Sequence, residues 1–248
     1  MLYVDLHSHV LWGIDDGARS LSVSLELLRL LHGLGFSEVY ATPHQKHGAF
    51  VPTAAEIAER FHQVRDAAAE AGLALRLHVA AENFWDEVLL GRLRSGEQPT
   101  YRESPEAAQS QVFLFELPVL QMPPNLEGQL FQLRLRGWLP VLAHPERYSP
   151  LWGRMDKVAA LARSAALVVD LGAIDGSQGP DRARAARQLL QDDLCHAVAS
   201  DIHAAADARG VAGGIAWIKK KLGEKRLRAL LCDGPRQIVA GELPDLAS

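Results

Sequence analysis

Histidines and acidic residues stand where the side chains of several strand-like segments would meet, and these residue types are metal ligands. His7 and His9 are separated by one residue, and residues at that spacing in a strand point to the same face. Asp201 and His203 repeat this spacing on the last strand-like segment. We expect one shared site formed by His7, His9, Asp16, His44, Glu82, Glu116, His144, Asp201 and His203.

Nine donor side chains exceed what one metal ion takes, so the set predicts two or three divalent ions. Imidazole nitrogen mixed with carboxylate oxygen suits Mn, Fe or Zn, and a carboxylate can bridge two ions. Ions held roughly 3.5–4 Å apart in this way serve hydrolysis, above all of phosphate esters. The expected chemistry is therefore metal-assisted phosphate-ester hydrolysis.

Two arginines lie near these ligands in the sequence. Arg147 follows His144 by three residues in the segment HPERY, and Arg209 follows His203 by six. Guanidinium groups bind phosphate oxygens in a bidentate manner, which suits a phosphate-ester substrate. A surface salt bridge is the alternative for both, and for Arg209 the two interpretations stay open.

Other catalytic chemistries leave no pattern in the chain. A thiolate phosphatase needs Cys, five residues and then Arg, and neither Cys195 nor Cys232 has Arg at that spacing. A Gly-rich nucleotide loop and a Gly-x-Ser-x-Gly motif are also absent from the sequence. The metal-dependent route is what remains.

The remaining histidines and one aspartate are assigned separately. We expect His47 to be a loop residue, whereas Asp170 could pair with a nearby arginine or hold a ligand histidine. Structural roles are expected for His32, His62, His78 and His196.

The elements that would position these residues alternate along the chain. Strand-like segments span residues 5–9, 38–44, 77–82, 112–116, 140–144, 166–170 and 196–203. Helical patterns span residues 21–34, 53–71, 124–136, 155–164, 181–191, 205–221 and 225–232, and loops are expected at 45–52 and 96–108. Thr53 and Glu56 form a capping box. Repeated strand–helix alternation predicts parallel strands in a closed or nearly closed α/β barrel.

Length and composition agree with this architecture. The 248 residues match the roughly 250 of one such barrel, so a single domain over residues 1–248 is expected. The net charge of −4 argues against a broad nucleic-acid or membrane surface. Two cysteines, no apolar run near the roughly 18 residues of a membrane span and no signal-peptide pattern predict a cytoplasmic protein without membrane insertion.

The motifs together resemble a known family. The opening DLHSHVLWGIDDGARS, followed by TPH, HPERY and SDIH, is similar to the polymerase-and-histidinol-phosphatase (PHP) superfamily. Within it, the chain most resembles the metal-dependent bacterial protein tyrosine phosphatases encoded with capsule and exopolysaccharide genes. The resemblance implies a distorted (β/α)7 TIM-like barrel holding divalent ions, often manganese, and a phosphotyrosine-containing tail of a bacterial tyrosine kinase as substrate.

The resemblance also implies a role for each site residue. His7, His9, Glu82 and Asp201 match one metal site, Glu82, Glu116 and His144 a second, and Asp16, His44 and His203 a third. Arg147 and Arg209 match phosphate-holding arginines, so the catalytic residues expected beside the metals are Arg147, Arg209, Asp16 and His44. The mechanism we expect is attack of a metal-bridging hydroxide on phosphorus without a phospho-enzyme.

Two departures from the family pattern concern substrate choice. Ala204 stands where relatives usually carry Asn after SDxH, and Asp170 opens a segment that often reads Asn-x-Gly-Ser. A phosphatase for histidinol phosphate or a similar small monoester is therefore an alternative. A metal-dependent amidohydrolase and a non-catalytic metal-binding scaffold are further ones. The sequence leaves the metal and the oligomeric state open.

Overall fold

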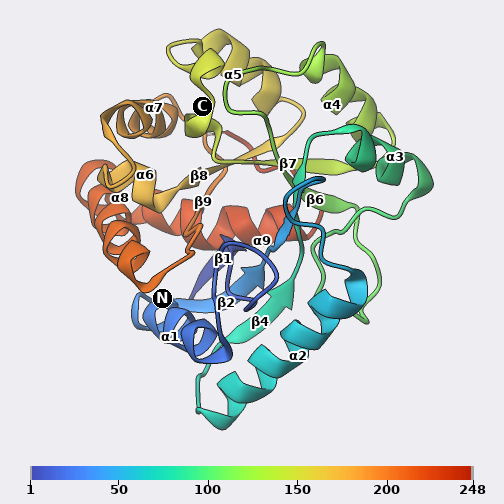
Figure 1. The fold of residues 1–248 in the computed structure, drawn as a ribbon. Helices are drawn as coiled ribbons and strands as arrows, with labels where there is room; N and C mark the ends of the chain where they lie inside the picture. The colour runs from blue at the N-terminus through green and yellow to red at the C-terminus, as the bar shows by residue number, and fades with distance from the viewer. Residues whose placement is uncertain (1, 247–248) are drawn as a thin grey trace.

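The computed structural model describes residues 2–246 as a mixed α/β fold with two parallel sheets (Figure 1). One sheet has the order β1 (Tyr3–Ser8), β2 (Phe36–Ala41), β4 (Arg76–Val79). The other has the order β3 (His44–Gln45), β5 (Glu82–Phe84), β6 (Val112–Glu116), β7 (Leu139–Ala143), β8 (Ala166–Asp170), β9 (Ala197–Ala199). Every named strand pair is parallel, as the strand–helix alternation predicts.

Two of the expected strand segments are each broken into two strands. Residues 38–44 divide into β2 and β3 around Pro43, which has no N–H to donate to a neighbouring strand. Residues 77–82 divide into β4, which pairs with β2, and β5, which pairs with β3. Backbone hydrogen bonds still join the two segments where their strands are interrupted: Ala80 N donates to Ala41 O at 2.8 Å, and Glu82 N donates to Pro43 O at 3.0 Å. The expectation of unbroken strands there was wrong.

The first strand also contacts the end of the chain. His9 N donates to Ile202 O at 3.0 Å, and Asp201 N donates to His7 O at 2.9 Å. Beneath them the buried Asp5 carboxylate accepts a bond from Ser200 N at 2.9 Å. Residues almost 200 positions apart are thereby held in register beside the strand ends.

Helices surround the strands on the outside (Figure 1). They are α1 (Leu21–Gly33), α2 (Ala54–Glu70), α3 (Glu87–Ser95), α4 (Leu126–Leu135), α5 (Met155–Ala162), α6 (Leu171–Asp175), α7 (Pro180–Gln191), α8 (Ala208–Arg228) and α9 (Gly234–Val239). The capping box of α2 is confirmed by reciprocal bonds between Thr53 and Glu56. The two expected C-terminal helices join in α8, which kinks at Gly223 with φ of +86°.

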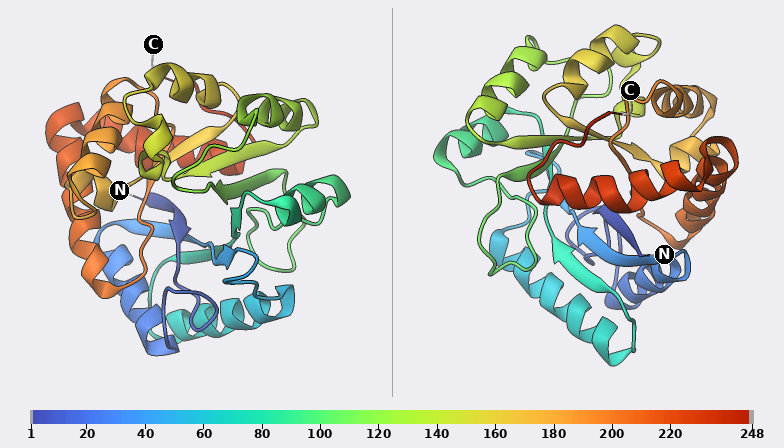
Figure 2. Two further views of the ribbon diagram at one scale, coloured as in Figure 1. Left: turned by 45° about the horizontal axis from the view of Figure 1, so that its top comes forward. Right: turned by 180° about the vertical axis from the view of Figure 1, so that it is seen from behind.

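The core lies on both faces of the strands. Inward-facing residues such as Leu6, Leu114 and Val168 form one buried cluster, and Ile238 of α9 packs on it. The segment from the end of α8 through α9 lies across the strands, as seen from behind in Figure 2. Outward-facing residues pack under the other helices. Between α6 and α8 the backbones touch: a Cβ added to Gly214 would stand 2.3 Å from Leu171 O.

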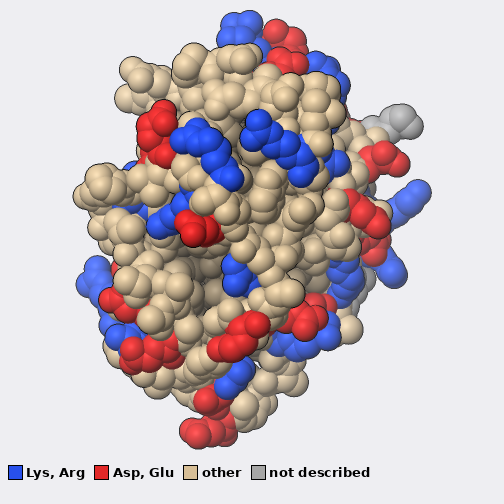
Figure 3. All heavy atoms as spheres, turned by 90° about the vertical axis from the view of Figure 1, so that its right-hand side faces the viewer, with Lys and Arg blue, Asp and Glu red and all other residues tan. Residues whose placement is uncertain are grey.

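The surface carries charges of both signs. Figure 3 shows one face on which basic and acidic side chains are interspersed. Within residues 2–246, no helix combines the length and apolar character needed to cross a membrane.

Candidate metal centre

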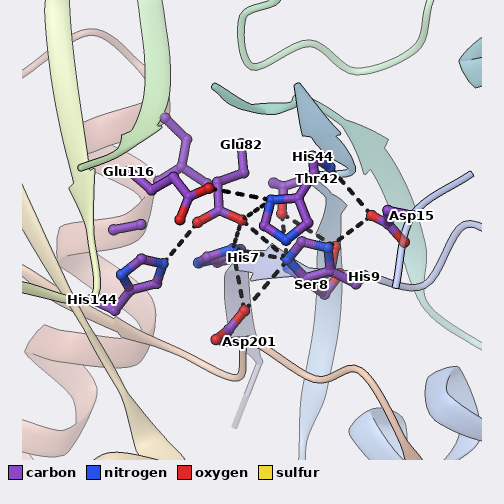
Figure 4. Close-up of polar contacts among 12 residues, drawn as sticks. His7, Ser8, His9, Asp15, Thr42, His44, Glu82, Glu116, His144 and Asp201 are labelled. Atoms are coloured by element: carbon purple, nitrogen blue, oxygen red, sulfur yellow. Dashed lines mark hydrogen bonds and ion pairs between the residues drawn. The ribbon is translucent and has the colours of Figure 1, made fainter. Parts of the chain in front are cut away.

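His7 in β1 and His9 just after the end of β1 face each other at the centre of the site (Figure 4). His7 Nε2 and His9 Nε2 are 3.1 Å apart, as their spacing predicts, and both side chains are buried. Glu82, the first residue of β5, places Oε2 3.2 Å from His7 Nε2 and 3.4 Å from His9 Nε2. Segments from both sheets therefore contribute to one cluster.

Asp201 approaches the same nitrogens from the far end of the chain. Its Oδ1 lies 3.3 Å from His7 Nε2 and 3.4 Å from His9 Nε2. The expectation that residues 201 and 203 continue the last strand was wrong, because β9 ends at Ala199 and Asp201 has φ of +48°. Aspartate tolerates this left-handed conformation better than most residues. His203 then stacks on His9 with ring centroids 4.0 Å apart.

A second group of donors surrounds Glu82 on its other side. His144 Nε2 lies 2.7 Å from Glu82 Oε1, and His44 Nδ1 lies 3.0 Å from Glu82 Oε2. Glu116 Oε1 is 3.7 Å from the same His44 nitrogen. His144 follows β7 with φ of +36°, and its other nitrogen, Nδ1, lies 3.1 Å from the Tyr148 hydroxyl.

Asp16 forms the exposed edge of the cluster. Its Oδ1 lies 3.4 Å from both His44 Nε2 and His203 Nε2, and 53% of its side chain is exposed. The structure thus brings together all nine side chains that the sequence singled out. Their donor atoms form four overlapping groups, each within 4.8 Å: His9, Asp16, His44 and His203; His7, His9 and Asp201; His7, Glu82 and His144; His44, Glu82 and Glu116.

The donor set fits divalent cations better than it fits a hydrogen-bonded network. The buried atoms His44 Nδ1, Glu116 Oε1 and Asp201 Oδ1 have no hydrogen-bond partner among the described residues, although imidazole nitrogens and carboxylate oxygens of the cluster lie within 4 Å of one another. Buried polar atoms in that state are costly unless something else binds them. Nitrogen and carboxylate oxygen donors at this density are the ligands of Mn, Fe or Zn.

The electrostatics of the buried carboxylates point the same way. Burial, and then the charge of Glu82, raises the pKa of Glu116. Burial would also raise the pKa of Glu82, but the surrounding imidazoles, led by His7, hold it well below its usual range. Two buried carboxylates that repel each other are stabilised when a cation lies between them.

Asp15 is a functional side chain that sequence reasoning missed. Its Oδ2 lies 2.8 Å from His9 Nδ1 and accepts a bond from His44 N at 3.2 Å, while its Oδ1 accepts one from Gly17 N at 2.9 Å. A carboxylate on the far ring nitrogen fixes the orientation and basicity of a ligand histidine. The signal available in the sequence was only the doubled aspartate of IDDG.

Arg147 lies beside the cluster and contacts two carboxylates. Its Nη2 donates to Asp170 Oδ2 at 3.0 Å and also contacts Asp201 Oδ2. The open question about Asp170 is answered, since it pairs with an arginine. The backbone N–H of Asp170 in turn donates to Glu146 Oε1 at 3.0 Å. Arg147 also lines a cavity of about 300 Å³ with Asp201, His203 and six further residues, among them Ser177 and Gln178.

Arg209 is placed differently. It is exposed in the first turn of α8, outside the residues that line this cavity, and it makes no ion pair within residues 2–246. Its phosphate-binding role stays a prediction.

Three of the histidines given structural roles have partners away from the metal centre. His62 pairs with Glu106 at 2.6 Å, and His78 stacks on Tyr40. His196 Nδ1 accepts the backbone N–H of Leu167 at 2.9 Å. These three predictions are consistent with the structure.

The fold and the clustered donors define an α/β protein with metal-ligand side chains gathered at the ends of parallel strands. The chain belongs to the family described as "Capsular polysaccharide synthesis, CpsB/CapC", which matches residues 3–240. The family resemblance found in the sequence is thereby confirmed.

Individual relatives agree with this membership. The tyrosine-protein phosphatase CpsB of Streptococcus pneumoniae is 31% identical over 255 residues, covering 97% of this chain and 99% of that protein. The tyrosine-protein phosphatase YwqE of Bacillus subtilis (strain 168) is 27% identical over 202 residues, covering 81% of this chain and 77% of that protein. A solved structure from work on YwqE and CpsB, described as unique metal-dependent tyrosine phosphatases, shares the fold with a TM-score of 0.85 at 22% identity over 99% of both chains.

Proposed function

We propose that this protein is a metal-dependent protein tyrosine phosphatase that acts on a phosphotyrosine-containing protein of polysaccharide synthesis, namely a bacterial tyrosine kinase. The observation that carries the proposal is the convergence of nine ligand-type side chains beside Arg147. The 31% identity to a tyrosine-protein phosphatase over nearly the whole chain supports the choice of substrate class.

The proposed ligands divide into three sets for two or three divalent ions, and Glu82 belongs to two of these sets; manganese is the first choice. His7, His9, Glu82 and Asp201 would hold one ion, Glu82, Glu116 and His144 a second, and Asp16, His44 and His203 a third. Bound ions of this kind lower the pKa of water toward about 7 and neutralise the entering and leaving oxygens.

The chain's own residues bind and orient the phosphate. Arg147 supplies planar N–H donors for the equatorial oxygens, and its pairing with Asp170 fixes the guanidinium plane. Arg209 is proposed as a second, more exposed phosphate ligand. Asp16 and His44 lie at the exposed edge, where the leaving phenol would depart. Because a phenol has a pKa of about 10, it needs little protonation to leave.

No side chain is proposed as a covalent nucleophile. Cys195 and Cys232 are buried, and the Cys195 thiol donates a hydrogen bond to Ala197 O at 3.0 Å. Burial raises the pKa of the Cys195 thiol to about 12, which keeps it protonated at neutral pH. Water is therefore the proposed nucleophile, and no phospho-enzyme forms.

The fold proposed for this activity is a distorted (β/α)7 barrel over a single domain, residues 1–248. The parallel pairing within both sheets and the backbone bonds between β1 and the segment after β9 support it. A cytoplasmic location is proposed because the tyrosine kinase proposed as substrate would be met there.

The test is hydrolysis of a phosphotyrosyl peptide by purified protein with Mn²⁺ and with a chelator. A phosphoserine peptide and histidinol phosphate serve as competing substrates. We expect chelator-sensitive release from phosphotyrosine alone, and orders of magnitude less turnover in Glu116→Ala and His144→Ala. Glu106→Ala, at an exposed carboxylate that pairs with His62 and is not part of the cluster, is the matched control. Turnover of histidinol phosphate alone would overturn the proposed substrate, and near-normal activity in both site variants would overturn the proposed centre.

A further inference from the structure

A short turn directly after His44 borders the metal centre. Lys46 N donates to Phe50 O at 2.6 Å, and Phe50 N donates to Lys46 O at 3.0 Å, which closes the turn. Two side-chain hydrogen bonds also fix the turn: Gln45 Nε2 donates to Pro52 O at 2.8 Å, and Arg92 Nη1 of α3 donates to Gln45 Oε1 at 2.9 Å. Phe50 is therefore carried by an anchored backbone.

The ring of Phe50 lies against a candidate metal ligand. Its centroid is 5.6 Å from that of His44, and the two planes differ by only 13°. Phe50 is half-buried, so part of its ring remains open beside the site. An aromatic surface thus stands next to the exposed edge formed by His44 and Asp16.

A second ring continues this surface. Phe84 ends β5 opposite Glu116, and Lys46 Nζ lies 4.3 Å above the ring centroid of Phe84. The same Nζ lies 3.5 Å from Glu116 Oε1. Two half-buried rings and one ammonium group therefore border the site on the β3–β5 side, and we call them the aromatic edge (Lys46, Phe50 and Phe84).

The opposite side of the site has a different chemistry. Arg147 with Asp170 occupies the β7–β8 side, and the cavity there is lined by polar residues such as Ser177 and Gln178. Guanidinium donors bind phosphate oxygens, whereas aromatic faces pack on other rings. The two sides together match the two halves of an aryl phosphate.

The geometry points to Phe50 as a specificity-determining residue that selects aryl over alkyl phosphate monoesters by packing on the ring of the phosphorylated side chain. The inference rests on the proposed phosphatase activity and names the residue that gives it its substrate preference. Removing the Phe50 ring should affect an aromatic ligand and leave a small alkyl ligand unaffected, because only the first contacts the aromatic edge.

The test compares the binding of phenylphosphonate and methylphosphonate to Mn²⁺-loaded protein by calorimetry. Phe50→Leu keeps an apolar side chain but removes the ring, and we expect it to lose roughly threefold to tenfold of the preference for phenylphosphonate. Phe50→Tyr should keep the preference. Phe131→Leu is the matched control, since Phe131 lies on α4 and is 52% exposed.

The outcomes separate this inference from the activity on which it rests. An unchanged preference in Phe50→Leu, or its loss in Phe50→Tyr, would overturn the role of the ring. A wild-type protein that prefers phenylphosphonate yet does not hydrolyse a phosphotyrosyl peptide would refute the proposed function while keeping the aromatic edge as a binding feature.

Discussion

Replacing Asp15 with Asn tests whether the buried carboxylate behind His9 orients a metal ligand. Asp15 accepts bonds from one imidazole and two backbone N–H groups, at 2.8, 2.9 and 3.2 Å. Asparagine keeps the shape but loses the charge, and a hydrogen bond to a charged group contributes about 1.5–3 kcal/mol. We expect the free energy of unfolding to fall by about 2 kcal/mol and Mn²⁺ affinity to fall by about 10–100-fold.

Two measurements on the same samples check this expectation. Mn²⁺ affinity is measured by calorimetry, and stability of the metal-free protein by urea unfolding. Asp66→Asn is the control, because Asp66 is exposed and its one ion pair within residues 2–246 is with its exposed neighbour Arg65. If Asp15→Asn bound Mn²⁺ as tightly as the wild type, His9 would not be a ligand oriented by Asp15.

Three further predictions concern the phosphate site, the core and pH. Arg147→Lys should lower kcat/KM for a phosphotyrosyl peptide roughly 100-fold, because an ammonium group cannot hold its acidic neighbours and phosphate in one plane; an unchanged kcat/KM would contradict this. Gly214→Ala should cost about 1–3 kcal/mol in urea unfolding because its Cβ would stand 2.3 Å from a carbonyl oxygen of α6. By contrast, Gly91→Ala meets nothing within 4 Å and should stabilise α3 by roughly 0.5–1 kcal/mol, so equal effects would refute the packing argument. Burial, followed by the charge of Arg226, lowers the pKa of His196 from 6.5 to about 4. The unfolded chain therefore takes up the proton first as pH falls, and stability should decline by about 3 kcal/mol from pH 6.5 to pH 4. In His196→Asn the pH slope of unfolding should be shallower, and parallel slopes would exclude this cause.

The strands were predictable where burial on both faces makes the sequence continuously apolar. Residues 112–116 and 166–170 became β6 and β8 with the expected bounds, and all ten residues are buried. Helices α3, α6 and α9 were not predicted. Helix α3 contains Gly91, which lowers helix propensity in its centre, and α6 has five residues that follow β8 without a break.

Most of the candidate ligands were predictable because they follow apolar runs, but the residues that position them were not. Asp15 and Asp16 are neighbours in one loop, and the sequence does not say which carboxylate faces inward. The path of the loop determines which carboxylate faces His9. Gly17 lies so close to His9 that an added Cβ would stand 2.2 Å from the His9 carbonyl oxygen. Arg147 finds its partners 23 and 54 residues away, a distance over which residue patterns carry no signal.

The pairing of the first strand with the segment after the last one has a consequence for synthesis. A chain made from its N-terminus exposes His7 and His9 early, yet Asp201 and His203 follow almost 200 residues later. During most of translation the early histidines therefore have no complete ligand set and β1 has no partner beyond β2. Contacts at such sequence separation form slowly. Tight metal binding should accordingly be among the last properties a nascent chain acquires, and it would report that the whole fold has assembled.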